Sequence, residues 1–275
     1  MKTLILLLIA LFLCLNASPA QSLRHPVALP YIGPGAYSQQ QTDPFSFTGN
    51  QAALAQVQQA GIGVYAERRF LLAATSYYAL AAVFPSKLGK FGLQLNYGGF
   101  KNFNENKIGL AYARNLGRKL DVGIQFNYYG YRVPGYAGAT AINFEAGLIM
   151  HFSDKFHGGM LVYNPVGGKL AKGSNEKLAS VYKMGFGYDA SPNFFAGMEI
   201  IKEEDRQVNC IASVLYRFAD KFFARVGVLT ESTSVFGGGG WRWNSLRVDV
   251  SASYHPQLGI SPGIMIIVNT KGKDR

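Results

Sequence analysis

The sequence predicts an all-β fold: a transmembrane up-and-down antiparallel β-barrel of about 14 strands, preceded by a short N-terminal helical plug. The first observation is a polar turn motif, at Lys119-Leu120, Asp154-Lys155-Phe156, Ser191-Pro192-Asn193-Phe194 and Asp220-Lys221-Phe222. Each copy is followed at once by a new apolar segment, and the spacing is about one long hairpin. Short turns at one end and longer loops at the other are typical of outer-membrane barrels.

The second observation is the composition, and the third is strict alternation. The chain contains 32 Gly, 16 Tyr and 19 Phe; glycine makes room in curved sheets, while Tyr and Phe suit barrel interfaces. A soluble β-sandwich could share this composition, but it would not need so many strands in one series. In 246–254 alternate residues are predicted to face lipid, with Arg247 and Asp249 facing inward. A one-residue shift would place Arg247 in hydrocarbon at a cost of about 2–4 kcal/mol, so the register is well specified.

Residues 1–20 are predicted to be a cleaved signal peptide. Lys2 supplies the positive start, Leu4 to Leu15 form the apolar run, and Ser18-Pro19-Ala20 precede the cleavage site. A run of about twelve apolar residues is too short to span a bilayer as a helix. A lipoprotein cleaved before Cys14 is an alternative, although the apolar run continues past that residue. The protein is therefore expected in the bacterial outer membrane.

Residues 21–60 are expected to form an extended segment and a plug helix. The segment up to residue 49 contains four prolines, and a helix is predicted at 51–59, with Asn50 as its N-cap and Gly61 ending it. The apolar side chains of this helix, Leu54 among them, are too small a surface to fold alone. The barrel lumen is the expected docking site.

Residues 61–275 are predicted to form the barrel, with even strand number as in bacterial single-chain barrels. Its short turns should lie on the periplasmic side. The predicted strands are 62–70, 72–84, 90–99, 106–116, 120–132, 141–153, 156–163, 180–190, 194–202, 207–218, 222–230, 233–243, 245–254 and 258–268.

Three segments carry a resemblance to a known family. They are Gly33-x-Gly35-Ala36, then Asp43-Pro44-Phe45-Ser46, then Asn50-Gln51-Ala52-Ala53-Leu54-Ala55, followed by a first strand that reads Gly63-Val64-Tyr65-Ala66-Glu67-Arg68-Arg69-Phe70. This order resembles the FadL-like outer-membrane barrels, and is most similar to the PorV/PorQ-type branch of the Bacteroidota. Family members commonly have Asn-Pro-Ala-x-Leu at the plug helix, and Gln51 stands here in place of the proline.

The resemblance implies a fourteen-stranded barrel with its N-terminal segment in the lumen, and two classes of function. Some family members carry hydrophobic compounds across the outer membrane, whereas others are accessory subunits of type IX protein export or of other outer-membrane machines. The external loops of this chain are short, which favours the accessory role in protein export or assembly. Transport of small hydrophobic compounds is the alternative, and it predicts an apolar cavity behind the plug.

The charge indicates the partners. The chain has 27 basic and 16 acidic residues, but the basic residues are spread over turns and one loop, and an exported protein rarely meets nucleic acid. Attraction to anionic outer-membrane lipid and lipopolysaccharide is the better explanation. A protein partner in an outer-membrane complex and a small hydrophobic ligand are the other expected partners.

No catalytic, cofactor or metal site is predicted. His25, His151, His157 and His255 form no set with a nucleophile or paired carboxylates at any defined spacing. The acidic run Glu203-Glu204-Asp205 lies at a hairpin tip between basic residues, where such groups are usually solvated. We therefore expect a protein that is not an enzyme.

Three further features are candidate functional residues. Glu67 and Arg69 alternate on the first strand and are expected to point inward, either as a simple pair or as a network that holds the plug through Asp43. The run Gly237, Gly238, Gly239 and Gly240 predicts close packing of the plug on bare backbone, or alternatively a lateral opening or a docking wall. Trp241 and Trp243 are expected in the periplasmic aromatic girdle.

Overall fold

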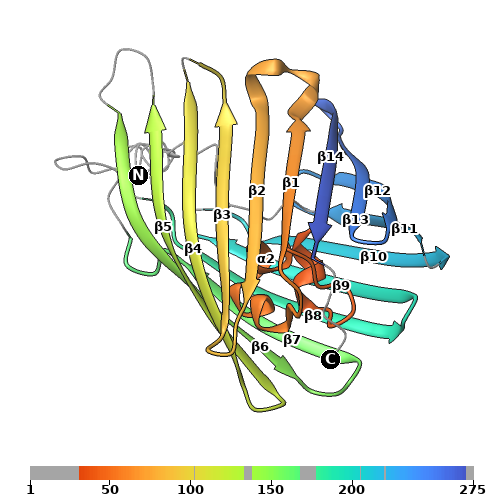
Figure 1. The fold of residues 1–275 in the computed structure, drawn as a ribbon. Coiled ribbons are helices and arrows are strands. Elements are labelled where there is room, and N and C mark those ends of the chain that lie inside the picture. The colour runs from red at the N-terminus through yellow and green to blue at the C-terminus, as the bar shows by residue number, and fades with distance from the viewer. Residues whose placement is uncertain are drawn as a thin grey trace, which may run out of the picture.

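Fourteen antiparallel strands close into one barrel, in which each strand pairs with its neighbours in sequence and β1 pairs with β14 (Figure 1). The structure is a computed structural model that describes residues 31–101, 103–132, 138–167, 178–204, 206–219 and 221–270. The predicted fold class and strand number are confirmed. The predicted signal peptide lies outside the described residues. In the described part of the chain, no helix has the length and apolar character needed to cross a membrane.

The strands follow the predicted ranges closely except in the first hairpin. The sequence predicts these two strands at 62–70 and 72–84, but the first ends at Arg68 and the second begins at Ser76. The chain leaves the extended conformation between them, where Phe70 and Leu71 adopt positive φ angles of 54° and 59°. Two short 3₁₀ turns, η3 (Arg69–Leu71) and η4 (Ala73–Thr75), fill this loop. The strands are β1 (Gly61–Arg68), β2 (Ser76–Pro85), β3 (Lys90–Gly99), β4 (Asn104–Leu116), β5 (Leu120–Arg132), β6 (Ala139–His151), β7 (Phe156–Tyr163), β8 (Val181–Ser191), β9 (Phe194–Glu203), β10 (Asn209–Ala219), β11 (Phe222–Leu229), β12 (Ser234–Trp243), β13 (Leu246–His255) and β14 (Gly259–Asn269).

Three short helices precede the barrel and lie inside it, near the end where the chain leaves β14 (Figure 1). They are η1 (Gly33–Tyr37), α2 (Ser46–Gly49) and η2 (Gln51–Gln56). Asn50 caps η2 by accepting a hydrogen bond from the Ala52 amide, as its position predicts. The helix is shorter than predicted and of the 3₁₀ type, and it ends at Gln56 rather than at Gly61. Residues 31–57 are almost entirely buried, and we call them the plug.

The two faces of the wall differ in chemistry. Every strand exposes at least one large apolar side chain on the outer face, from Ile62 on β1 to Ile264 on β14, as expected of a barrel that faces lipid. The predicted alternation in β13 is confirmed, because Arg247 and Asp249 are buried whereas Val250 and Tyr254 are exposed.

The barrel has a short-turn end and a long-loop end. The short turns, such as 117–119 and 244–245, lie at the same end as Gly61 and Asn269, which pair where β1 meets β14. Short turns mark the periplasmic end of outer-membrane barrels, so we call this the periplasmic end. The loops at the other end include 69–75 and 164–180.

Candidate functional site: the plugged lumen

Glycines on the inner face form a seat for the plug. A methyl group added at Gly185 would overlap the ring of Tyr37, and one at Gly123 would overlap the backbone of Gln51. Because these positions lack side chains, the plug packs directly against strand backbone and leaves little room for solute to pass. The glycines that meet plug atoms in this way are Gly61, Gly63, Gly92, Gly123, Gly147, Gly159, Gly185, Gly187, Gly197 and Gly238, on eight of the strands.

The first polar contact between plug and wall is centred on Glu145 of β6. The Glu145 carboxylate accepts a hydrogen bond from the Gln51 side chain of the plug. It also pairs with the Lys107 ammonium at 2.5 Å and accepts from Asn127 at 2.8 Å. All of these side chains are buried, and buried charges need such partners. The wall therefore presents a fully satisfied carboxylate to the plug.

The second contact is an ion pair. Arg247 of β13 donates through Nη1 to Asp43 of the plug at 2.9 Å, and through Nε and Nη2 to Asp249 at 2.8 and 2.5 Å. The other oxygen of Asp43 accepts from the Phe45 amide at 2.8 Å. Asp43 thus shapes the start of α2 and ties it to the wall.

The third contact is a row of four ionisable residues from four adjacent strands: Asp121 (β5), His151 (β6), His157 (β7) and Asp189 (β8). His151 Nε2 lies 2.7 Å from Asp121, the two Nδ1 atoms lie 2.9 Å apart, and His157 Nε2 lies 3.5 Å from Asp189. We call this set the His–Asp row. The two imidazoles must share a proton between their Nδ1 atoms, because two unprotonated nitrogens at this distance would repel.

Two segments of the plug bind the His–Asp row. Ser38 donates through its hydroxyl to Asp189 at 2.6 Å, and the Gln39 amide donates to the same carboxylate at 3.1 Å. Gln56, at the end of η2, donates to Asp121. These contacts are made by polar and charged groups, which water can hydrogen-bond if the plug moves away.

Two tyrosines of the plug are buried against charged wall residues. Burial raises the pKa of Tyr31 to about 12, with a further contribution from Asp249. Burial, together with Glu199, also raises the pKa of Tyr37 well above its usual value. Arg225 donates to the Tyr31 carbonyl and stacks over the Tyr31 ring at 5.0 Å. Both tyrosines therefore remain neutral, and they add a cation–π contact to the seal.

The long-loop half of the lumen has a mixed lining. Buried apolar and aromatic side chains from β2, β5–β10, β12 and the loop after β7 form one cluster there with the apolar residues of the plug, and buried polar side chains such as Glu105, Asn143 and Asn209 lie in the same half. Its members above the plug include Tyr77, Tyr129, Ala139, Ala141, Leu161, Tyr163, Leu178, Val181, Ile201, Ile211 and Phe236.

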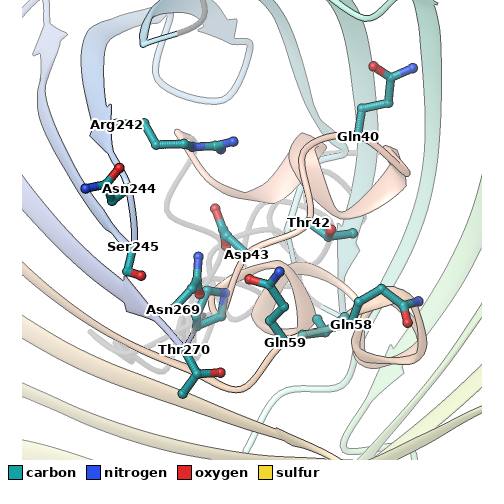
Figure 2. Close-up of a pocket in the computed structure, with 12 residues that line it drawn as sticks. Gln40, Thr42, Asp43, Gln58, Gln59, Arg242, Asn244, Ser245, Asn269 and Thr270 are labelled. Atoms are coloured by element: carbon teal, nitrogen blue, oxygen red, sulfur yellow. The ribbon is translucent and has the colours of Figure 1, made fainter. Parts of the chain in front are cut away.

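A polar pocket of about 680 Å³ lies at the periplasmic end, between the plug and the last strands (Figure 2). We call it the mouth pocket. It is lined by Gln40, Thr42, Asp43, Pro44, Val57, Gln58, Gln59, Arg242, Asn244, Ser245, Asn269 and Thr270.

The predicted plug residues Asp43, Asn50 and Leu54 all lie in the plug, and each is buried. The Asn50 amide donates to the carbonyls of Leu148 and Met160, on β6 and β7. The structure does not bring Asp43 to the first strand, because its partner is Arg247.

Glu67 and Arg69 lie at the opposite, long-loop end of the barrel. They form a pair at 3.9 Å, and Arg69 stacks over the Tyr77 ring at 5.1 Å. Arg69 is in η3 rather than in β1. No described plug residue contacts them through a hydrogen bond or ion pair, so the arrangement corresponds to the simple pair.

The four-glycine run shows no gap in the wall. β12 pairs with β11 and with β13 across Gly237, Gly238, Gly239 and Gly240. A methyl group at Gly238 would lie 2.8 Å from the Tyr31 ring, so this glycine admits the plug. Gly237 instead lines an apolar groove on the outer face of β8–β12.

Trp241 and Trp243 are exposed on the outer face at the periplasmic end of β12, with ring centroids 6.0 Å apart. Phe218 and Phe222 stack nearby on β10 and β11 at 6.3 Å. This position is that of an interfacial aromatic side chain.

Sequence reasoning missed the His–Asp row and the position of Arg242 in the lining of the mouth pocket. His151 and His157 flank the turn at 152–155 and are direct cross-strand partners, so hairpin register alone could have paired them. Within the described residues, no group of three or more His, Cys, Asp or Glu side chains is arranged to hold a metal ion. The acidic run at 203–205 lies partly outside the described residues, and Glu203 pairs with Arg206 at 3.6 Å.

The geometry defines a class of protein: a closed fourteen-stranded membrane barrel sealed from inside by its own N-terminal segment. No protein-family model matches the chain, and no curated protein is similar enough in sequence to match. Solved structures of FadL-like outer-membrane barrels share the fold.

Three of these structures illustrate the similarity. The CymD monoaromatic hydrocarbon channel has a TM-score of 0.64 at 13% identity, over 89% of this chain and 99% of that one. The P. putida toluene transporter TodX has a TM-score of 0.54 at 11% identity, over 81% of this chain and 93% of that one. A Pseudomonas aeruginosa FadL homologue has a TM-score of 0.53 at 11% identity, over 86% of this chain and 95% of that one. At these identities the likeness concerns the fold, and it does not single out the PorV-type branch.

Proposed function

We propose that this protein lets small hydrophobic compounds cross the bacterial outer membrane, with the plug as the part that opens. The observation that carries the proposal is a cluster of aromatic and aliphatic side chains in the long-loop half of the lumen, set among polar ones, above a plug that polar contacts tie to the wall. The hydrocarbon channel and toluene transporter that share the fold support the same function. Residues 1–20 would direct export and be removed.

The plug must move for a solute to pass. In the described structure, glycines on eight strands meet plug atoms, and side chains of β11 and β13 bind the plug as well. Every pair of neighbouring strands is hydrogen-bonded, so the wall is closed. A solute that binds the apolar cluster in the long-loop half of the lumen would compete with the apolar plug residues for the same surface. Displacing the plug would also cost its polar contacts with the wall.

A disulfide between plug and wall tests this mechanism. A Cβ built at Gly197 on β9 lies 2.9 Å from the Cβ of Pro34 in η1, about 0.6 Å below the lower end of the usual disulfide range. The variant carries Pro34→Cys and Gly197→Cys with Cys210→Ser, which removes the native thiol. Uptake of radiolabelled toluene is measured in bacteria that express it, before and after reduction with dithiothreitol.

Oxidised cells should take up toluene more slowly than reduced cells, and the Cys210→Ser parent should show no dependence on reductant. Equal uptake in the oxidised and reduced states would show that solute does not need plug movement. If the parent took up no more toluene than cells without the protein, the proposed transport itself would be wrong.

A second candidate function is the accessory role in an outer-membrane export or assembly machine. The comparisons give this role no support, but one surface feature favours it. An apolar groove of about 810 Å³ crosses the outer face of β8–β12, where Ala196, Ala212 and Gly237 are small. Another barrel could lie against such a groove, and outer-membrane lipid or lipopolysaccharide would cover it otherwise. Recovery of a stoichiometric membrane partner with the tagged protein would favour this role.

A further inference from the structure

The mouth pocket contains an exposed arginine, Arg242, that forms no ion pair with a carboxylate among the described residues. Arg242 on β12 lies directly opposite Arg247 on β13, and both are on the inner face. Two like charges at directly opposed positions destabilise a strand pair. Arg242 is exposed at the mouth of the barrel, so an anion in the pocket can reach its guanidinium group and reduce this repulsion.

The two nearby carboxylates both serve Arg247. Arg247 donates two hydrogen bonds to Asp249 and a third to Asp43. No ion pair or side-chain hydrogen bond joins the Arg242 guanidinium to another described residue. With Arg225, this part of the lumen holds three guanidinium groups and two carboxylates, so one positive charge remains.

Arg242 extends from β12 across the mouth pocket towards the plug (Figure 2). The rest of the lining is mostly neutral and able to hydrogen-bond. It includes the carboxamides of Gln40, Gln59 and Asn269 and the hydroxyl of Ser245. Carboxamides and hydroxyls can both donate and accept hydrogen bonds. A guanidinium binds the oxygens of a carboxylate or phosphate in pairs.

We propose that the mouth pocket is a binding site for a polar anion that carries a carboxylate or a phosphate, with Arg242 as its anchor. The volume of about 680 Å³ suits a ligand of small-molecule size. This site lies on the periplasmic side of the plug and takes a ligand opposite in polarity to the compounds proposed to cross the barrel, so it is a site beyond the transport function.

The position of the site gives ligand binding a structural consequence. Gln40, Asp43 and Gln59 belong to the N-terminal segment, whereas Arg242 and Asn269 belong to the barrel. A ligand that contacts both sides joins them. It stabilises the plugged state in proportion to its binding, because it binds that state and not the open one.

Binding is measured by tryptophan fluorescence of the purified barrel in detergent, because the two Trp residues of the chain, Trp241 and Trp243, flank Arg242. Citrate and inorganic phosphate are the probes at low ionic strength, with sucrose as the neutral control and sodium chloride as the control for ionic strength. Saturable responses to citrate identify carboxylate binding, and responses to phosphate identify phosphate binding.

Arg242→Gln should weaken binding at least about tenfold, and Arg242→Lys, which keeps the charge but not the paired geometry, should weaken it by a smaller factor. Arg118→Gln is the matched control, because Arg118 is an exposed arginine in the β4–β5 turn at the same end of the barrel; it should bind as the parent does. Heat-modified migration in gels verifies that each barrel is folded. Absence of a saturable response to both anions, an equal response to sodium chloride, or unchanged binding by folded Arg242→Gln would each overturn the proposal.

Discussion

The ion pair between Asp43 and Arg247 should control how often the plug opens. Asp43→Asn removes the charge and keeps the shape. The amide oxygen can still accept from the Phe45 amide, as the carboxylate does at 2.8 Å. Arg247 keeps its two hydrogen bonds to Asp249. The substitution therefore weakens the link between plug and wall and leaves the wall intact.

The size of the effect follows from what remains after the change. Removing one partner of a buried pair costs about 3–5 kcal/mol when the other charge is stranded. Here Arg247 is not stranded, so the loss is one charge-assisted hydrogen bond, about 1.5–3 kcal/mol. Tenfold corresponds to 1.4 kcal/mol, so the open plug should become about 10- to 150-fold more populated.

Alkylation of a buried thiol measures that population. Ala53 is fully buried in the plug, and Ala53→Cys in the Cys210→Ser background places a single reporter thiol there. When plug opening and closing are fast relative to labelling, the rate of maleimide modification follows the equilibrium population of the open form. The rate should rise by the same factor of about 10 to 150 in Asp43→Asn.

Asp154→Asn is the control, since Asp154 is exposed in the turn between β6 and β7. It removes the same charge from the same end of the barrel and should leave the labelling rate unchanged. A rate in Asp43→Asn that equals the parent rate, in a barrel that is still folded, would refute the role given to this ion pair. An equal increase in both variants would point to net charge rather than to the pair.

Two further substitutions test the seat and the polar wall. Gly185→Val should prevent Tyr37 from docking and should speed thiol labelling in the plug. Gly239→Val, at a position that faces lipid, should leave the labelling rate unchanged. Equal labelling rates in the two variants would contradict the role given to Gly185. Glu145→Gln leaves the buried Lys107 ammonium without its ion pair and should lower the free energy of unfolding in urea by about 3–5 kcal/mol. Glu231→Gln, in an exposed pair, should cost less than about 1 kcal/mol, and equal losses in the two variants would contradict this account of Glu145.

The strands could be predicted because the signals that specify them are local. In β13 the alternation of Arg247 and Asp249 with Val250 fixes which face is inside, and the predicted range 245–254 differs from Leu246–His255 by one residue at each end. The first hairpin failed for an equally local reason. Its apolar residues, Phe70 to Leu72, look like strand, but two of them adopt positive φ angles, and no residue there is the glycine that usually marks such a turn.

The site could be predicted only where hairpin register was enough. Arg242 and Arg247 face each other across the two-residue turn 244–245, so their opposition is implicit in the sequence, although the flanking tryptophans drew the interpretation towards the aromatic girdle. The pairing of Asp43 with Arg247 is different, because 204 residues separate them. Nothing local encodes it; it requires the plug to sit at a particular height in the closed barrel.

The same reasoning decides which part of the protein should open. Separating two strands would leave backbone amides and carbonyls facing lipid, at several kcal/mol for each unsatisfied group, and the ladder is continuous between all neighbouring strands. Releasing the plug breaks one ion pair and several hydrogen bonds, each worth about 1–3 kcal/mol, and uncovers buried apolar plug residues such as Phe45, Phe47 and Leu54 at about 1.5–3 kcal/mol each. Water from the periplasm can satisfy the freed polar groups, and an apolar solute can cover part of the apolar surface. The contacts that break when the plug leaves include Asp43–Arg247, Gln51–Glu145 and Ser38–Asp189. An apolar solute above the plug gains nothing from the polar groups around Glu145. Its route therefore depends on the plug leaving the lumen rather than on two strands separating. A disulfide between residues 34 and 197 should stop passage of the solute.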